Sequence, residues 1–454
     1  MALNFVSVVI LTAFLPLILL KMVFHWHRKT GRRKTVGFFH PYCNAGGGGE
    51  KVMWCAINAL QKKYPKWEFV IYTGDVESPP NLILKNAKER FNISLERGVT
   101  FVYLRTRFLV EAKMYPIFTL LGQSIGSVIL GLEALFRFLP DVYVDSMGYA
   151  FTFPLFKYIG GCHIACYVHY PTISTDMLHL IQSGAATYNN RAVVSRSPLL
   201  SRCKLIYYQF FAAIYGFVGS RADLILVHLV YPPCQTEELS SLPLLNDDEK
   251  PRWDIVSVAQ FRPEKNHELQ LRAFKCLLEK AKALKMKTEN LHLILIGGCR
   301  HAEDEMRVNL LKDLAKTLDI DDQVQFHLNV SFSELKEAFQ NGTIGLHTMW
   351  NEHFGIGVVD GMAAGLIMVA HNSGGPKMDI VISHGGNRTG FLADDEESFA
   401  GAILEVMKMS SEEKRTIQLA ARQVFPLWRE SVERFSMARF EESILNCFRM
   451  LLSE

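Results

Sequence analysis

The sequence lacks the signatures of several common enzyme classes. It has no CxxC pair, no cluster of His and Cys at zinc spacing, and no DxD triplet of the metal-binding kind at the end of a predicted strand. A metal is therefore not implied, and the nine cysteines, an odd number, fit free thiols in a reducing compartment better than a disulfide framework. A net charge of +3 over 454 residues, without long basic runs in the interior, argues against nucleic acid as a partner.

Two series of short apolar runs, each run followed by a turn and a helical pattern, make up most of the chain. This alternation is typical of parallel sheets that helices cover on both faces. A polar stretch at 239–252 separates the two series, and we interpret it as the linker between two doubly wound α/β domains that face a cleft. The predicted strands are 36–39, 69–72, 142–145, 164–168 and 224–227 in the first series, and 255–258, 291–296, 324–327, 344–346 and 367–370 in the second.

The N-terminal residues predict a transmembrane helix. Residues 5–20 are apolar apart from Ser7, and Met22–Phe24 extend the run past Lys21 to about the width of a bilayer. A cleaved signal peptide is the alternative, but the charged first region and the cleavage site that it requires are missing. The basic residues that follow place the body of the protein on the cytosolic side. We therefore expect an anchor and basic flank at 1–34, a first domain at 35–245, a second domain at 246–430, and a C-terminal helix at 431–454 that crosses back to the first domain.

Residues 347–365 form the most informative stretch. Glu352 is followed eight positions later by Asp360, across the turn Phe354–Gly357 that opens a predicted helix. The free N–H groups at such a helix start bind a diphosphate, and the two carboxylates are then placed for sugar hydroxyls on either side. An ordinary helix start with Glu352 as a cap is the alternative interpretation.

Glycine-rich turns follow several predicted strands. Gly46–Gly49 lies between the first strand and a helix, where it lets the backbone approach a phosphate or a sugar. The run is not a P-loop, because no GK[ST] follows it, and it fails the dinucleotide fingerprint at Lys51. Gly297 is expected to form part of a ligand wall, and Gly374 with Gly375 a nucleotide or acceptor loop.

Three further side chains stand at predicted strand ends that face the cleft. Arg262 and Lys265 are suited to neutralising a diphosphate from the wall of the second domain, and a solvated pair of loop charges is an equal alternative. His169 closes a strand of the first domain, for which a buried structural histidine is the competing interpretation.

Together these segments resemble the family 4 retaining glycosyltransferases of the GT-B fold. Within that family the chain is similar to the α-1,2-mannosyltransferases of the endoplasmic reticulum that extend a dolichol-linked oligosaccharide. The resemblance covers nearly everything after the anchor. It is carried by residues 38–45 with the glycines that follow, and by 145–151, 167–172, 261–267 and 347–357.

The resemblance implies a reaction and a place. The expected reaction is retaining transfer of mannose from GDP-mannose to a dolichol-linked oligosaccharide, without a cofactor. The expected place is the cytosolic face of the endoplasmic reticulum membrane, for a single-pass protein with other mannosyltransferases of that membrane as partners. One alternative is a catalytically weakened chain that acts as a non-enzymatic partner of such an assembly. Another is a different sugar-nucleotide enzyme on the same fold, which would not need an anchor.

The resemblance also implies roles for individual residues. Glu352 is expected to contact the transferred mannose and Asp360 the ribose hydroxyls, with Phe354, Gly355, Ile356 and Gly357 on the diphosphate. Arg262 and Lys265 are expected to stabilise the departing GDP. The other assignments are the donor sugar for His169, the donor for Gly46, Gly47, Gly48, Gly49 and Gly297, and the acceptor side for Tyr149, Tyr170, Gly374 and Gly375.

The chain departs from the family pattern at two side chains. Asp360 stands where members usually carry glutamate, and the shorter side chain predicts weaker donor binding. Gln260 replaces an arginine, so that Arg262 is expected to serve in its place.

A third departure is a missing segment. Two residues separate the predicted strand 224–227 from Val230, where the relatives have a helix. A parallel crossover needs a dozen or more residues, so that Val230–Cys234 cannot pair parallel with that strand. We therefore expect this version to fold poorly or to turn over slowly.

Two further stretches, 117–139 and 205–218, are long, rich in aromatic residues and nearly uncharged. Basic residues lie near both of them, as expected of elements at a lipid surface. Buried core helices are an equal interpretation.

Overall fold

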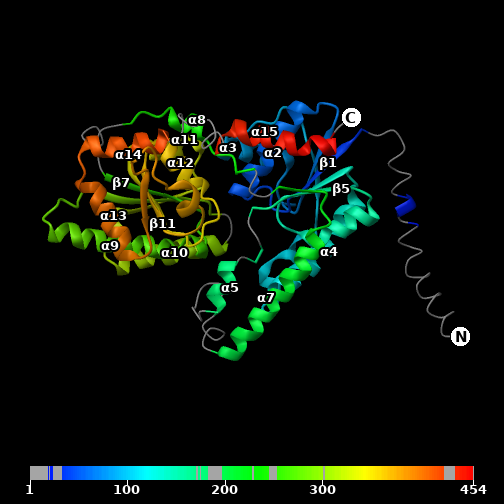
Figure 1. The fold of residues 1–454 in the computed structure, drawn as a ribbon, viewed down its shortest axis with the longest axis horizontal. Coiled ribbons are helices and arrows are strands. Elements are labelled where there is room, and N and C mark those ends of the chain that lie inside the picture. The colour runs from blue at the N-terminus through cyan, green and yellow to red at the C-terminus, as the bar shows by residue number, and fades with distance from the viewer. Residues whose placement is uncertain are drawn as a thin grey trace.

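The protein consists of two α/β domains that lie side by side (Figure 1). The predicted transmembrane helix, apart from residues 19 and 21–23, and residues 245–252 of the predicted linker lie outside the described part of the chain. The computed structural model describes residues 19, 21–23, 33–169, 172–173, 175–182, 197–226, 230–244, 253–299, 302–423 and 435–452.

The first domain is built on one parallel sheet of six strands. Its elements are β1 (Thr35–Phe39), α2 (Gly48–Lys63), β2 (Glu68–Thr73), α3 (Pro80–Phe91), β3 (Thr100–Tyr103), α4 (Thr119–Arg137), β4 (Val142–Asp145), β5 (His163–Tyr167), α5 (Thr175–Gln182), α7 (Pro198–Gly219) and β6 (Leu224–Leu226). The strand order is β3-β2-β1-β4-β5-β6, and Val36 of β1 pairs with Phe69 of β2 and with Val142 of β4. The predicted strands of the first series are confirmed, and β3 is an additional strand at the sheet edge.

The second domain repeats this architecture. Its elements are α8 (Thr236–Ser240), β7 (Trp253–Val258), α9 (His267–Ala283), β8 (Leu291–Gly297), α10 (Ala302–Thr317), β9 (Val324–Leu328), α11 (Phe332–Asn341), β10 (Gly342–His347), α12 (Ile356–Ala364), β11 (Ile367–His371), β12 (Gly390–Ala393), α13 (Glu396–Lys408) and α14 (Ser411–Gln423). A last helix, α15 (Met437–Leu452), follows this domain in sequence. The strand order is β12-β11-β10-β7-β8-β9, all parallel. The predicted fold class is therefore confirmed, with β12 as a strand that the pattern did not predict.

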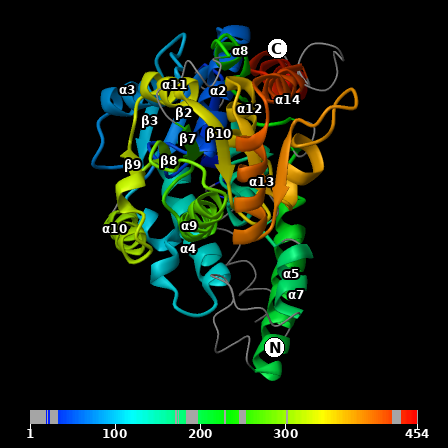
Figure 2. The ribbon, with the colours of Figure 1, turned by 90° about the vertical axis from the view of Figure 1, so that its left-hand side faces the viewer.

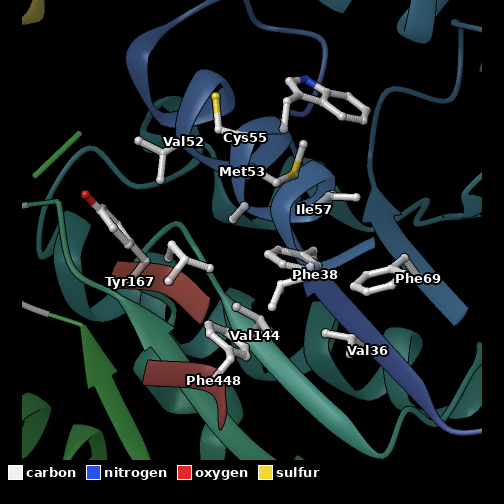
Figure 3. Packing of buried hydrophobic residues seen from close by; sticks show 14 of the residues in the cluster. Val36, Phe38, Val52, Met53, Cys55, Ile57, Phe69, Val144, Tyr167 and Phe448 are labelled. Atoms are coloured by element: carbon white, nitrogen blue, oxygen red, sulfur yellow. The ribbon is translucent and has the colours of Figure 1, made fainter. Parts of the chain in front are cut away.

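Each sheet has a hydrophobic core on both faces, because successive side chains of a strand point to opposite sides. In β1, Val36 and Phe38 pack with Ile57 of α2 on one face (Figure 3). Phe39 belongs to a separate cluster on the other face. Helix α15 is part of the first face, where it contributes Phe448 (Figure 3). The C-terminal helix therefore lies on the first domain although it follows the second domain in sequence.

The two segments of the chain that connect the domains, one near Cys234 and one near Ser436, lie next to each other. Val230–Cys234 lies outside the first sheet, and Cys234 forms an isolated parallel bridge with Ser436, just before α15. The backbone N–H of Cys234 donates to the carbonyl of Phe435 at 3.0 Å. Within the described residues, this segment is therefore not paired with β6, as the two-residue connection predicts.

A variant with a longer connection between Val227 and Val230 tests how much stability the protein loses through the missing segment. We expect the melting temperature to rise by about 5 °C when a helical crossover of a dozen or more residues is inserted between Val227 and Val230, which corresponds to about 2 kcal/mol for a domain of this size. A Gly/Ser insertion of the same length is the control, since it lengthens the connection without adding a helix. Equal melting temperatures for the helical and the Gly/Ser versions would contradict the prediction.

Helix α7 extends below the two domains in Figure 1, and Figure 2 shows it projecting beyond them from a second side. Helix α4 packs on the first domain, and near its start the backbone N–H of Leu121 donates to the Tyr207 hydroxyl of α7 at 3.1 Å. Of the described residues, α4 is the helix long and apolar enough to cross a membrane, by length and composition only. Both helices carry large apolar side chains at the surface. Phe210 and Phe217 of α7 are 67% and 65% exposed, and Phe136 of α4 is 61% exposed. The alternative that both are ordinary buried helices therefore does not hold for these faces.

Candidate active site

A cavity of about 2800 Å³ lies between the two domains, at the carboxyl ends of their strands. This is where open α/β sheets bind ligands. The cavity brings together most of the residues singled out in the sequence. Those that line it are Gly46, Gly47, Gly48, Gly49, Tyr149, His169, Arg262, Lys265, Gly297, Glu352, Phe354, Gly355, Ile356, Gly357 and Asp360.

Glu352 is the most strongly held carboxylate of the cavity. Its Oε2 atom lies 2.5 Å from Lys265 Nζ and 3.3 Å from His347 Nε2. Burial alone would raise the pKa of Glu352, but His347 and the charge of Lys265 outweigh it and hold this pKa well below the ordinary value. Thr348 holds the backbone of Lys265 in place, since its hydroxyl donates to the Lys265 carbonyl at 3.0 Å. The carboxylate is therefore ionised and fixed in place, beside a cation that faces the same cavity.

The turn after Glu352 opens helix α12. Gly355 adopts a φ of +100°, a conformation that favours glycine, and α12 starts at the next residue. The N–H groups in the first turn of a helix have no acceptor within the helix, so that the end of α12 in the cavity is suited to an anion.

Gly374 and Gly375 do not line the cavity. The N–H of Gly375 donates to the Glu352 carbonyl at 2.7 Å, and a Cβ on Gly374 would lie 2.2 Å from the same oxygen. Both glycines therefore support the Glu352 loop from behind, because only residues without a side chain fit there. This placement corrects the prediction that they form an acceptor loop.

Asp360 contacts the first domain as well as the cavity. Its Oδ1 accepts the backbone N–H of Gln235 at 2.9 Å, and Oδ2 lies 3.8 Å from Lys51 Nζ at the start of α2. Burial raises the pKa of Asp360, while the nearby Lys51 charge lowers it. The predicted contact of this carboxylate with ribose remains a prediction, and in the structure its oxygens join the two domains.

The glycine run approaches the second domain closely. A Cβ on Gly48 would lie 3.0 Å from Ile356 Cδ1, and one on Gly47 would lie 2.7 Å from Gln260 Nε2. Gln260, the residue that replaces an arginine, therefore lies against the glycine run. Side chains on the run would separate the two walls that a donor must bridge.

Three neighbouring strands of the first domain end in titratable residues: His40 after β1, Asp145 on β4 and His169 after β5. Asp145 and His169 line the cavity, whereas His40 is buried behind its wall. Asp145 accepts the N–H groups of Met147 at 3.1 Å and Gly148 at 3.0 Å, which shapes the loop that carries Tyr149. Burial raises the pKa of Asp145 to about 6 and lowers that of His169 to about 4.

The protonation of His169 follows from its partner. Its Nε2 lies 3.1 Å from the carbonyl oxygen of Ser146, which can only accept, so that Nε2 carries the proton. Since its pKa is lowered to about 4, the ring is neutral at neutral pH. His169 faces Gly49, where a Cβ would lie 3.4 Å from Nε2.

The remaining predicted residues differ in their settings. Arg262 is exposed on the cavity wall just before a short 3-10 helix that ends in Lys265. Gly297 packs against the loop after β7, where a Cβ would lie 2.0 Å from the Ala259 carbonyl oxygen. Tyr170 lies outside the described residues.

Metal binding has no obvious site in the part of the chain that the structure describes. Its His, Cys, Asp and Glu side chains form no group of three or more that could hold a metal ion. The sequence-based expectation that no metal takes part remains a prediction.

Three titratable residues of the site were not predicted. His347 lies at the end of β10, and Glu50 and Lys51 follow the glycine run directly. Each stands at a strand end or helix start, which is the signal that identified their neighbours. The partner of Lys51 is Asp360 of the other domain, a contact too distant in sequence to be recognised without the structure.

Family comparisons cover both domains. Residues 33–231 match "ALG11 mannosyltransferase N-terminus", and residues 246–423 match "Glycosyl transferases group 1". The GDP-Man:Man(3)GlcNAc(2)-PP-Dol alpha-1,2-mannosyltransferase of Mus musculus is 52% identical, over 94% of this chain and 89% of its own length. The protein of that name from Homo sapiens is 52% identical over 93% of this chain and 88% of its own, and the one from Dictyostelium discoideum is 44% identical over 92% and 85%.

The mouse comparison also bears on the missing segment. Its 446 aligned positions exceed the 94% of this 454-residue chain that they cover. That is the pattern expected if the relative has an internal segment that this chain lacks.

Solved structures support the architecture. Sucrose-phosphate synthase from Thermosynechococcus elongatus superimposes with a TM-score of 0.60 at 16% identity, over 93% of this chain and 100% of that chain. An alpha,alpha-trehalose-phosphate synthase from Burkholderia xenovorans gives a TM-score of 0.61 at 12% identity, over 92% and 100%. These likenesses establish the GT-B fold, and the sequence matches establish the family. The chain is a glycosyltransferase of group 1 and belongs to the mannosyltransferase family that has the ALG11 N-terminal domain.

Proposed function

We propose that this protein transfers mannose from GDP-mannose to a dolichol-diphosphate-linked oligosaccharide, forming an α-1,2 linkage with retention. The names of relatives 52% identical to it support the choice of substrates. The observation that carries the proposal is the ionised Glu352, held between Lys265 and His347 at the start of α12. A sugar diphosphate needs this combination of a fixed carboxylate for hydroxyl groups, a cation, and free helix N–H groups.

The residues support a front-face mechanism. The bond from the anomeric carbon to the phosphate oxygen breaks, the acceptor hydroxyl oxygen bonds to that carbon from the same face, and the hydroxyl proton passes to the leaving phosphate. Negative charge grows on the phosphate, where Lys265, Arg262 and the start of α12 stabilise it. Glu352 binds mannose hydroxyls and is not required as a nucleophile. His169, being neutral, binds the donor sugar by hydrogen bonding.

The geometry gives no support to a non-enzymatic partner subunit. Such a chain is free to lose its donor contacts, whereas here Lys265, Glu352 and the Gly355 turn are all in place. Asp360, although shorter than the usual glutamate, still lines the cavity.

The proposed acceptor is lipid-linked, and the exposed faces of α4 and α7 are suited to a bilayer. Phe210 and Phe217 are exposed, while Lys204 and Tyr207 of the same helix line the cavity. Because one helix serves both surfaces, a lipid-borne sugar has a short path from membrane to site. The dolichol-linked substrate in the names of the relatives supports a location at the endoplasmic reticulum membrane, for which we propose a single anchor and a cytosolic body.

The decisive assay uses the purified chain in detergent, GDP-mannose and a trimannosyl dolichol-type acceptor, with product size read by mass spectrometry. We expect products larger by one or two hexoses, which an α-1,2-specific mannosidase removes. The Glu352→Gln variant, which keeps the size of the side chain and removes its charge, is the matched control. Hexose transfer that resists the mannosidase would contradict the linkage, and absence of transfer by the unchanged chain would contradict the function.

The cytosolic orientation predicts that the asparagine sequons carry no glycans. Asn387 is a useful reporter, because it is exposed in a turn between His384 and Arg388, whereas Asn341 is half-buried. Sequons at Asn92 and Asn329 complete the set. We expect no mobility shift on glycosidase treatment of protein from eukaryotic cells, and the same mobility for Asn387→Gln. A glycan at Asn387 would place the body in the lumen.

A further inference from the structure

A buried polar cluster lies beneath the glycine run. His40, which follows β1, is 0% exposed. Its Nδ1 lies 2.7 Å from Ser146 Oγ, and its Nε2 lies 3.7 Å from Oε1 of Glu50, in the first turn of α2. The mechanism above uses none of these three residues. A buried histidine between a hydroxyl and a carboxylate therefore needs another explanation.

Glu50 is tied to the glycine run itself. Its Oε2 accepts the backbone N–H of Gly47 at 2.5 Å. The contact fixes the run to the helix that follows it, but it also places a negative charge beside the surface that approaches a diphosphate. Like charges in a partly desolvated cavity repel strongly. The affinity of the cavity for an anion therefore depends on whether the Glu50 carboxylate points toward the anion or away from it.

The surroundings of His40 indicate that the nitrogen that faces Glu50, Nε2, carries the proton of the ring. The Ser146 hydroxyl has two acceptors within reach, His40 Nδ1 at 2.7 Å and the Phe39 carbonyl at 3.4 Å. Nδ1 is the nearer acceptor, and donation to it leaves the proton of a neutral ring on Nε2. Among the residues that the structure describes, Nε2 has no hydrogen-bond partner, and Glu50 Oε1 lies just beyond hydrogen-bond distance. A small movement of either side chain completes the bond.

We infer that His40 is a positioning residue for donor binding: its Nε2–H holds the Glu50 carboxylate against the Gly47 amide and away from the donor diphosphate. The inference rests on the proposed function in that the anion is taken to be a nucleoside diphosphate. His40 does not touch the substrate. It acts through Glu50, which shapes the glycine run.

Two substitutions of His40 separate its two nitrogens. His40→Asn keeps a polar group near the position of Nδ1 and removes the donor at Nε2, whereas His40→Gln places an amide N–H near the position of Nε2. We expect the Kd for GDP, measured by calorimetry on the full chain, to rise about tenfold or more in His40→Asn and to stay within about threefold of the unchanged protein in His40→Gln. Transfer assays should show the same rise in KM for GDP-mannose, with kcat at saturating donor little changed.

The double variant His40→Asn/Glu50→Gln tests the inference most directly. Glutamine at position 50 still offers an oxygen to the Gly47 N–H but carries no charge, so that GDP affinity should return to within about threefold of the unchanged protein. Equal loss of GDP affinity in His40→Asn and His40→Gln, or no recovery in the double variant, would overturn the inference. So would losses of affinity that only follow a lowered melting temperature, since His40 would then be structural. Failure of the unchanged protein to bind GDP contradicts the proposed function instead.

Discussion

Lys265→Met is expected to lower kcat by about 10²- to 10³-fold, the usual effect of removing one preorganised electrostatic contact to a transition state. Lys265 Nζ lies 2.5 Å from Glu352, and the two side chains are only 19% and 15% exposed. The charge therefore acts in a cavity with little solvent screening, where negative charge grows as the diphosphate leaves. Initial rates at saturating GDP-mannose measure the effect.

Two further variants sharpen this prediction. Lys265→Arg keeps the charge but not the compact ammonium group that fits beside Glu352, so that we expect partial activity. Lys275→Met makes the same change at a half-buried lysine of α9 that does not line the cavity and that pairs with Glu279 four residues away, and it should leave kcat unchanged. A kcat for Lys265→Met within threefold of the unchanged protein would remove Lys265 from the mechanism.

Lys51→Met is expected to lower the free energy of unfolding by about 3–5 kcal/mol, the usual cost of leaving one member of a buried ion pair unpartnered. The side chains of Lys51 and Asp360 are 6% and 14% exposed, and they belong to different domains. Urea denaturation, followed by probes in each domain, measures the loss. Lys51→Met/Asp360→Asn should recover most of it, because the buried charge that needs Lys51 is then gone.

The pH dependence of the stability loss in Lys51→Met distinguishes an unpaired buried Asp360 from a simple loss of side-chain packing. Burial already raises the pKa of Asp360 above its unfolded value, and removing Lys51 raises it further. A carboxyl with a raised pKa in the folded state binds its proton more tightly there than in the unfolded state. The loss in Lys51→Met should therefore shrink as the pH falls below neutrality. A loss that does not change with pH, or one as small as that of the exposed control Lys85→Met, would contradict the buried-pair explanation.

The fold followed from sequence pattern because buried parallel strands are continuous apolar runs. The strands that the pattern did not predict, Thr100–Tyr103 and Gly390–Ala393, are four residues long and lie at sheet edges. An edge strand has a neighbour on one side only, so that its sequence is less constrained to be apolar. Thr100 is exposed and the rest of its strand is only half-buried, so that the run has little of the apolar continuity that marks a central strand.

Charged residues that line the cavity could be predicted where they follow a predicted strand closely in sequence, as Lys265 and Glu352 do. The contacts across the cavity were not. Lys51 and Asp360 are far apart in sequence, and no local pattern relates them. Gly374 was misassigned for the same reason: a glycine turn at a strand end serves a ligand or a neighbouring loop equally well, and only the closeness of the Glu352 carbonyl decides.

The two passages of the chain between the domains have a mechanical consequence. Because Cys234 and Phe435 are hydrogen-bonded to each other, both passages act as a single pivot. Asp360 lies beside this pivot, through its contact with Gln235, and so moves least when the domains separate. Entry and exit of a nucleotide sugar should therefore occur by a hinge motion that widens the gap on the side of α4 and α7 and leaves the Lys51–Asp360 end nearly closed.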